Sequence, residues 1–241
     1  EGMAAWDSGD DGDLPYTAST SSSPHTLSLP ADTKLIVWNN KTFVPGGDVT
    51  LNSGTGTSYD GTLELRDNAT YESSASVVED IVVGGSWLTG SGATFVAGTS
   101  SVIFVGTSSD MHVSPDASSF NSLTFNGVGG TWTFDDTAAT TTSDFIITNG
   151  TVNVASSTLA VGGSFVNSGS MNAASTSITF SSTGNESVTF NGDEVGSLTF
   201  TGAGNFTMTD TDATSTGDVR IAAGSVVLPN GTFAVRNAFE N

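Results

Sequence analysis

Hydrophobic and polar residues alternate in short segments from about Leu27 to the end of the chain. Typical segments read KLIVW, TLEL, SVIF, TWTF, TVNV and SITF, and Gly, Asn, Asp and Ser separate them. β-branched and aromatic residues in a period of two are typical of β-strands, and no stretch has helical spacing over ten or more residues. The pattern predicts an all-β protein.

Similar sequence segments recur at offsets of 74 to 78 residues, which indicates an internal repeat. VGGSW at 83–87 matches VGGSF at 161–165, and SLTF occurs at both 122–125 and 197–200. A partial copy lies upstream, interrupted by the insertion ATYESSASVVED. The chain therefore divides into an acidic, Ser-rich N-terminal arm (1–25), a partial repeat with an insertion (26–80), a first repeat (81–160) and a second repeat (161–241) that ends at the start of a further repeat.

Two folds are compatible with copies of about 75 residues. One is a parallel β-helix, or β-solenoid, with three rungs of ~25 residues per copy, and the other is a series of tandem small β-sandwich domains. The very short, evenly spaced strands favour the solenoid. In a solenoid, equivalent side chains of successive rungs stack on one another in the core. Asparagines at the corners form ladders of hydrogen bonds from one rung to the next. The predicted inner layers contain Phe104, Phe125, Phe134, Phe180, Phe190 and Phe200.

The strongly negative net charge of the chain limits the kinds of molecule that it can bind. The 241-residue chain has five Lys and Arg against 25 Asp and Glu, a net charge of −20. Five scattered cations exclude nucleic acid and anionic membrane surfaces as partners. There is no cysteine and no apolar run long enough to insert into a membrane. Because the chain begins without Met, we expect a mature extracellular or cell-surface product from which an export signal was removed.

The segments SFNSLTFNGVGGTWTFDD and STSITFSSTGNESVTFNG resemble the repeats of large exported surface proteins of bacteria and archaea with parallel β-helix folds. The resemblance covers residues from about 81 to 235. It implies a surface stalk, fibre or adhesin, and it brings no catalytic residues.

Acidic clusters are the first candidate sites. The tail segment DSGDDGD could bind Ca²⁺, but the ligand spacing of a calcium loop would place Gly9 and Ala18 at ligand positions, so we expect a solvated tail and no cofactor. Its carboxylates are Asp7, Asp10, Asp11 and Asp13.

The segments FDDT at 134–137 and MTDTD at 208–212 occupy equivalent corners of the two copies. Stacked carboxylates could form an acid/base pair, but no Lys or Arg lies near them in the sequence, and His25 and His112 have no counterpart in the other copy. We expect turn-capping aspartates and no enzymatic activity.

Aromatic residues divide into core and candidate surface positions. Trp87 aligns with Phe165 and Trp132 with Phe206, which predicts core positions, and Trp38 is predicted to be buried as well. Tyr59 and Tyr71 are the candidates for an exposed sugar-binding surface. Possible glycosylation sequons begin at Asn40, Asn68, Asn149, Asn185, Asn205 and Asn230.

These observations favour a structural subunit of an extracellular fibre or stalk that assembles head-to-tail with copies of itself. Val235 and Phe239 align with Val161 and Phe165, so a further copy begins without a polar cap. The expected interface also contains Trp6, Leu14 and Tyr16 of the arm, added across the junction as a strand. The alternatives are a carbohydrate-binding adhesin that recognises surface glycans and a polysaccharide-active enzyme.

Overall fold

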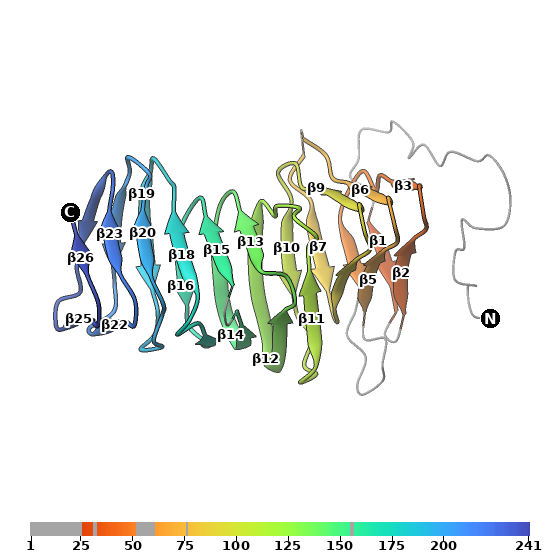
Figure 1. Cartoon of the computed structure of the whole chain (residues 1–241). Helices are drawn as coiled ribbons and strands as arrows, with labels where there is room; N and C mark the ends of the chain where they lie inside the picture. Colours follow the sequence, from red (N-terminus) through yellow and green to blue (C-terminus); the bar gives the residue numbers. More distant parts are fainter. Residues whose placement is uncertain (1–25, 31–32, 52–60, 76, 155–156) are drawn as a thin grey trace, which may run out of the picture.

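The computed structural model describes residues 26–30, 33–51, 61–75, 77–154 and 157–241. These residues form 26 β-strands and no helix, and every strand pairing among them is parallel. The strands stack into a β-solenoid of about 10 turns with ~21 residues in each turn (Figure 1). The all-β solenoid is therefore confirmed, and the tandem sandwich is wrong because sandwich sheets are antiparallel.

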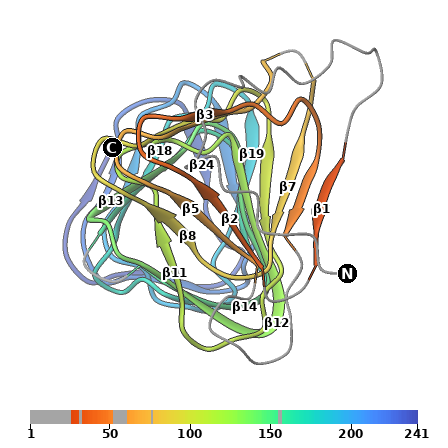
Figure 2. The same ribbon diagram turned by 90° about the vertical axis from the view of Figure 1, so that its right-hand side faces the viewer.

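Each turn passes over three faces, and Figure 2 views the stack along its length. The first face contains β1 (Leu27–Leu29), β4 (Val49–Leu51), β7 (Asp80–Val83), β10 (Ser101–Phe104), the first halves of β12 (Ser122–Phe134) and β14 (Phe145–Asn153), β16 (Phe165–Asn167), β19 (Asn185–Thr189), β21 (Asn205–Met208) and β24 (Ser225–Val227). β12 and β14 continue around a corner onto the second face.

The second face contains β2 (Lys34–Val37), β5 (Thr62–Leu65), β8 (Trp87–Thr89), β11 (Met111–Ser114), the second halves of β12 and β14, and β17 (Ser170–Asn172). It continues through bridges from Ala173 to Val195 and Ser215, and ends with β22 (Ala213–Ser215) and β25 (Phe233–Val235). The third face contains β3 (Thr42–Phe43), β6 (Thr70–Glu72) and β9 (Thr94–Val96), then β13 (Ala138–Thr141), β15 (Thr158–Val161), β18 (Ser177–Phe180), β20 (Leu198–Phe200), β23 (Val219–Ile221) and β26 (Phe239–Glu240).

The core is a column of inward side chains from all three faces. Strand register places Phe104 on Phe125, Phe145 on Phe165, and Phe180 on Phe200, and these ring pairs stack at 5.1, 5.3 and 5.0 Å between centroids. The six phenylalanines predicted for the inner layers are all buried. The aromatic residues that replace one another in the two copies are also buried, and they therefore fill the core as predicted. These residues are Trp87 and Phe165, and Trp132 and Phe206.

The glycines of NGVGGTW make room for one large ring. β12 turns from the first face to the second at this segment, and its register shifts between Phe125 and Thr131. A Cβ on Gly130 would lie 2.7 Å from Trp132 Cη2, and a Cβ on Gly127 would lie 2.9 Å from the same atom. Glycine is therefore needed where the main chain passes the Trp132 indole.

The sequence repeat does not coincide with a whole number of turns. SVIF of β10 lies on the first face of the fourth turn, whereas its copy SITF in β18 lies on the third face of the seventh turn, eleven faces later. Spreading the 74–78 residue offset over eleven faces gives about seven residues per face, and three such faces give the ~21-residue turn. The predicted three rungs of ~25 residues per copy are therefore wrong.

Two aromatic predictions are also wrong. Trp38 is 37% exposed, because it follows the inward Val37 and alternation turns it outward. Tyr71 is fully buried, because it occupies an inward position of β6 between Phe43 and Phe95 of the neighbouring turns. Tyr59 lies outside the described residues. The described part of the chain contains no helix that is long and apolar enough to cross a membrane.

Candidate functional sites on the solenoid surface

Aspartates at the corners join adjacent turns. Within the described residues, nine of them accept a hydrogen bond from a main-chain N–H on a neighbouring turn, at distances between 2.6 and 3.1 Å. Asp is suited to this role because its short side chain reaches the neighbouring backbone without much loss of side-chain freedom. The aspartates that do this are Asp48, Asp67, Asp116, Asp136, Asp144, Asp193, Asp210, Asp212 and Asp218.

Asp210, one of the two corner aspartates considered for acid/base chemistry, has both oxygens engaged. Its Oδ2 accepts from Phe190 N at 2.7 Å and its Oδ1 accepts from Asn191 N at 2.8 Å. The prediction of a turn-capping aspartate is confirmed at this position. A carboxylate held by two main-chain donors contributes to the stacking of turns.

Asp135, the equivalent corner residue, pairs with His112 instead. His112 Nδ1 lies 2.9 Å from Asp135 Oδ1, and His112 Nε2 lies 3.4 Å from Asp110 Oδ1. The hydrogen bond to Asp135 raises the pKa of His112, and both carboxylate charges add to the effect, whereas partial burial opposes it. The 23 residues between His112 and Asp135 correspond to about one turn, which is the sequence signal that reveals this pair.

This cluster lacks the arrangement of a nucleophilic triad. Ser114 Oγ donates to Asp135 Oδ2 at 3.0 Å, whereas a triad requires the serine to contact the histidine. With a carboxylate on each side of the ring, the cluster stabilises an imidazolium and acts as a charged link between turns.

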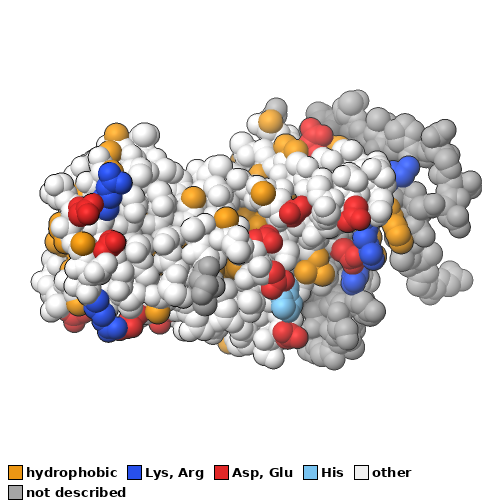
Figure 3. All heavy atoms as spheres, viewed as in Figure 1, with side chains coloured by type: hydrophobic (Ala, Val, Ile, Leu, Met, Phe, Trp, Pro, Cys, Tyr) orange, Lys and Arg blue, Asp and Glu red, His pale blue; other side chains and the backbone are white. Residues whose placement is uncertain are grey.

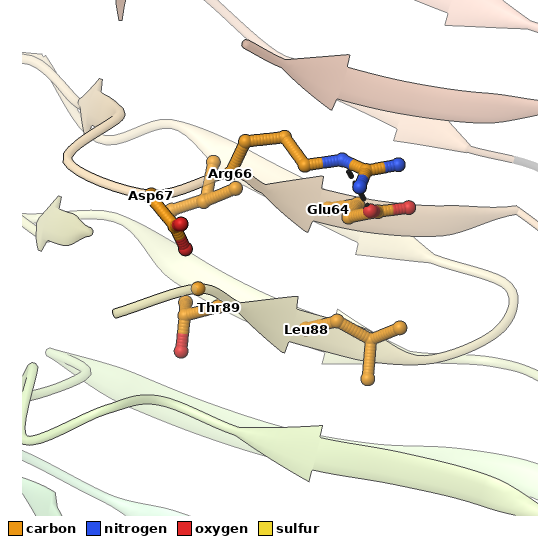
Figure 4. Close-up of a pocket in the computed structure, with 7 residues that line it drawn as sticks. Glu64, Arg66, Asp67, Leu88 and Thr89 are labelled. Carbon is orange, nitrogen blue, oxygen red and sulfur yellow. Dashed lines mark ion pairs between the residues drawn. The ribbon is translucent and has the colours of Figure 1, made fainter. Parts of the chain in front are cut away.

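The second face also has a charged cluster around Glu64, and Figure 4 shows Glu64 with Arg66. Glu64 Oε2 accepts from Lys34 Nζ at 2.8 Å, and Glu64 Oε1 lies 2.6 Å from Arg66 Nε. Arg66 Cζ lies 5.3 Å from the centroid of the exposed Trp38 ring, in cation–π geometry. Beside the cluster is a hollow of ≈ 200 Å³ that reaches Thr89 and Gly90. Pockets for drug-sized ligands start at about 300 Å³, so this hollow suits at most a small group.

Glu79 is a fully buried carboxyl group at the corner that leads into β7. Its Oε2 accepts from Ser74 N at 3.2 Å, while its Oε1 has no hydrogen-bond partner among the described residues. Burial raises the pKa of Glu79, the hydrogen bond from the Ser74 main chain and the nearby Ser73 hydroxyl oppose this, and the Asp48 charge adds a smaller increase. Tyr71 lies nearby, and burial together with the Glu79 charge raises the pKa of its phenol well above the usual range.

No group of three or more His, Asp or Glu side chains in metal-binding geometry occurs among the residues that the structure describes. The candidate calcium ligands Asp7, Asp10, Asp11 and Asp13 lie outside those residues, as do Trp6, Leu14 and Tyr16 of the expected interface.

The sequon asparagines occupy two kinds of position. Asn149 Nδ2 donates to Asn126 Oδ1 at 2.8 Å, and Asn205 Nδ2 donates to Asn185 Oδ1 at 2.7 Å, so these residues form the predicted ladders. Asn40 and Asn68 have positive φ angles of 59° and 57° at exposed turns, and Asn230 is also exposed. The ladder amides of Asn149 and Asn205 are already hydrogen-bonded, whereas Asn40 and Asn68 lie at exposed turns.

The last turn of the stack has an incompletely covered apolar layer, formed by Val226, Phe233, Val235 and Phe239. The register of these residues places them on the buried Phe206, Ala213, Ser215 and Val219 of the turn before. Phe239 is 47% exposed, although its register partner Val219 is 1% exposed. The two predicted interface residues that the structure describes, Val235 and Phe239, therefore belong to one layer.

Together, the fold and these sites define a parallel β-solenoid in which side chains at the corners form hydrogen bonds between adjacent turns. A scan against protein-family models finds no match to this chain, and comparisons with curated proteins and with solved structures find no match either.

Proposed function

We propose that the chain is a structural module of an extracellular surface fibre or stalk. Two features support this proposal. The interior is a continuous column of packed side chains, and the corner aspartates engage main-chain donors of adjacent turns. The resemblance of the repeats to those of exported surface proteins supports the location.

The observation that carries the proposal is the apolar end layer. Val226, Phe233, Val235 and Phe239 have the inward register of a core layer, and Phe239 is 47% exposed, so this layer offers an apolar surface on which a further turn can stack. We propose that a turn from a second copy of the chain covers it. Because this contact joins two different surfaces, it repeats without closing and gives a filament.

The proposal is tested by placing a charge in the end layer. Phe239→Asp puts an unpaired carboxylate into the proposed junction, and Val227→Asp is the control. Val227 lies on the same turn and is 57% exposed, but it alternates with the inward Val226 and faces outward. Sedimentation velocity over a concentration series, with negative-stain microscopy, measures assembly.

We expect the parent chain and the Val227→Asp variant to form threads that lengthen with concentration, and the Phe239→Asp variant to stay monomeric. A parent chain that is monomeric at every concentration contradicts assembly from copies. Equal assembly by the two variants contradicts the assignment of the junction to the end layer.

The arm is tested separately. If residues 1–25 cross the junction, deletion of residues 1–20 leaves monomers or short oligomers. Threads of undiminished length after this deletion would show that the arm has no part in the junction, without affecting the end-layer proposal.

The alternative proposal, a carbohydrate-binding adhesin, is favoured by the exposed Trp38 ring beside the Glu64 cluster. Aromatic rings at a protein surface are common contact points for ligands. Glycan-array binding by the parent chain that disappears in the Trp38→Ala variant supports this alternative, and an array without binding contradicts it.

A further inference from the structure

The outward side of β13, β15, β18 and β20 on the third face is uncharged. Alternation with buried residues such as Leu159, Ile178 and Leu198 identifies the outward positions. Six are Thr, three are Ser, two are Ala and one is Gly. We call this surface the hydroxyl array, and its members are Ala138, Thr140, Thr142, Thr158, Ala160, Gly162, Ser177, Thr179, Ser181, Ser197, Thr199 and Thr201.

The hydroxyl array is regular in both directions. Thr140, Ala160, Thr179 and Thr199 form one row by direct strand register, with no register shift between the strands. Neighbouring strands lie ~4.8 Å apart, and outward residues of one strand recur every ~6.7 Å. Threonine is stiff at χ1, so its methyl and hydroxyl groups are held in place before any partner binds.

The charges of the chain lie outside the array. The next strand, β23, presents Arg220, which register places beside Glu240 of β26, and this pair marks the boundary. In Figure 3 the surface over β13 to β18 is almost free of the red and blue side chains that gather toward both ends. In a chain with a net charge of −20, a neutral face indicates a neutral partner.

Two neutral partners fit less well. Sugar rings are usually held on aromatic side chains, but the phenylalanines of these strands, Phe180 and Phe200, are buried on the opposite side. The array covers roughly 400 Å² at the strand spacings above, about half of what each partner contributes to a standard protein interface. A second copy is therefore a poor occupant.

We infer that the hydroxyl array binds the surface of ice. Ice is an uncharged and periodic lattice of hydrogen-bond donors and acceptors, so it is matched by hydroxyl groups on an uncharged face whose strands are in direct register. The threonine methyl groups exclude disordered water between the hydroxyls. Charged side chains would impose hydration shells incompatible with the lattice, which accounts for their absence from the array.

The experiment compares two bulky substitutions. Thr179→Tyr inserts a ring into the middle of the array, and Thr207→Tyr inserts the same ring on the outward side of β21 on the first face. Circular dichroism and thermal unfolding establish that both variants fold. Inhibition of ice recrystallisation and thermal hysteresis are then measured for the intact parent chain and both variants.

The parent chain and the Thr207→Tyr variant should inhibit recrystallisation, and Thr179→Tyr should lose the inhibition. A parent chain without activity overturns the inference, and so does an equal loss in both variants. A pull-down on crystalline cellulose and chitin provides a further arm. Retention there that depends on Thr179, without an effect on ice, assigns the array to polysaccharide instead. Thread formation by the end layer is independent of every one of these outcomes.

Discussion

The role of the corner aspartates can be measured at Asp210. Asp210→Asn preserves size but replaces one carboxylate oxygen with an NH₂ group, which then faces a main-chain donor, Phe190 N or Asn191 N. The hydrogen bond from Phe190 N is partly buried and the one from Asn191 N is exposed, so the cost of losing one of them lies near the lower end of the range of about 1–3 kcal/mol for a buried unsatisfied donor, and the remaining bond loses the extra strength of a charged acceptor. We expect the variant to lose about 1–2 kcal/mol of local stability, which corresponds to roughly 5- to 30-fold faster opening.

Hydrogen exchange of the Phe190 and Asn191 amides is the appropriate measurement, because solenoids can open locally without unfolding as a unit. The matched control is Asp110→Asn, since Asp110 is 94% exposed and its one described contact is the 3.4 Å ion pair with His112. That substitution should change stability by less than about 1 kcal/mol. If both variants exchange at the parent rate, the corner aspartates do not hold the turns together and another role for them must be found.

Three further predictions concern the core and the two perturbed titrating groups. Phe180→Ala removes a ring stacked 5.0 Å from Phe200 and should cost about 3–5 kcal/mol in urea denaturation, whereas a loss below 1 kcal/mol would argue against the packed column. The raised pKa of Glu79 means that stability falls as pH rises from the usual Glu range through the folded pKa, so Glu79→Gln should be more stable than the parent at neutral pH by about 1–3 kcal/mol. This advantage should vanish in acid, and a constant difference across pH would refute it. The raised pKa of His112 means that its stabilisation is fully present below the unfolded pKa and disappears as pH rises through the folded one. His112→Asn should therefore remove this part of the pH dependence of thermal unfolding, and an unchanged profile would show that the pair contributes nothing.

The strands and their stacking could be predicted because, in a solenoid, the local alternation of residues shows which side chains form the core. Alternation identifies inward residues such as Phe125 and Phe200 without knowledge of their neighbours. The number of residues in a turn could not be obtained in the same way. Matching segments such as SLTF reveal how far apart two equivalent strands lie, but not how many faces separate them, and that number is set by the corners.

The candidate sites were harder to predict because they depend on contacts between turns. His112 and Asp135 come together because one turn separates them, and a wrong turn length hides that relation. The exposure of Trp38 depends on a single step of alternation after Val37, and the burial of Tyr71 depends on the aromatic rings stacked on either side of it. Sequence spacing identifies these residues only after the register is known.

The eleven-face repeat also affects where a binding site can arise. Because the repeat is not a whole number of turns, SLTF faces one side of the solenoid in β12 and another in β20. The same segment therefore has to fit two faces, which Ser, Thr and Asn can do because they are acceptable at outward positions of either face. The hydroxyl array fits this constraint, because it combines β13 and β15 of the first repeat with β18 and β20 of the second. Sites with particular chemistry must instead use unrepeated residues, and Trp38, Glu79 and His112 all lie in the first half of the chain.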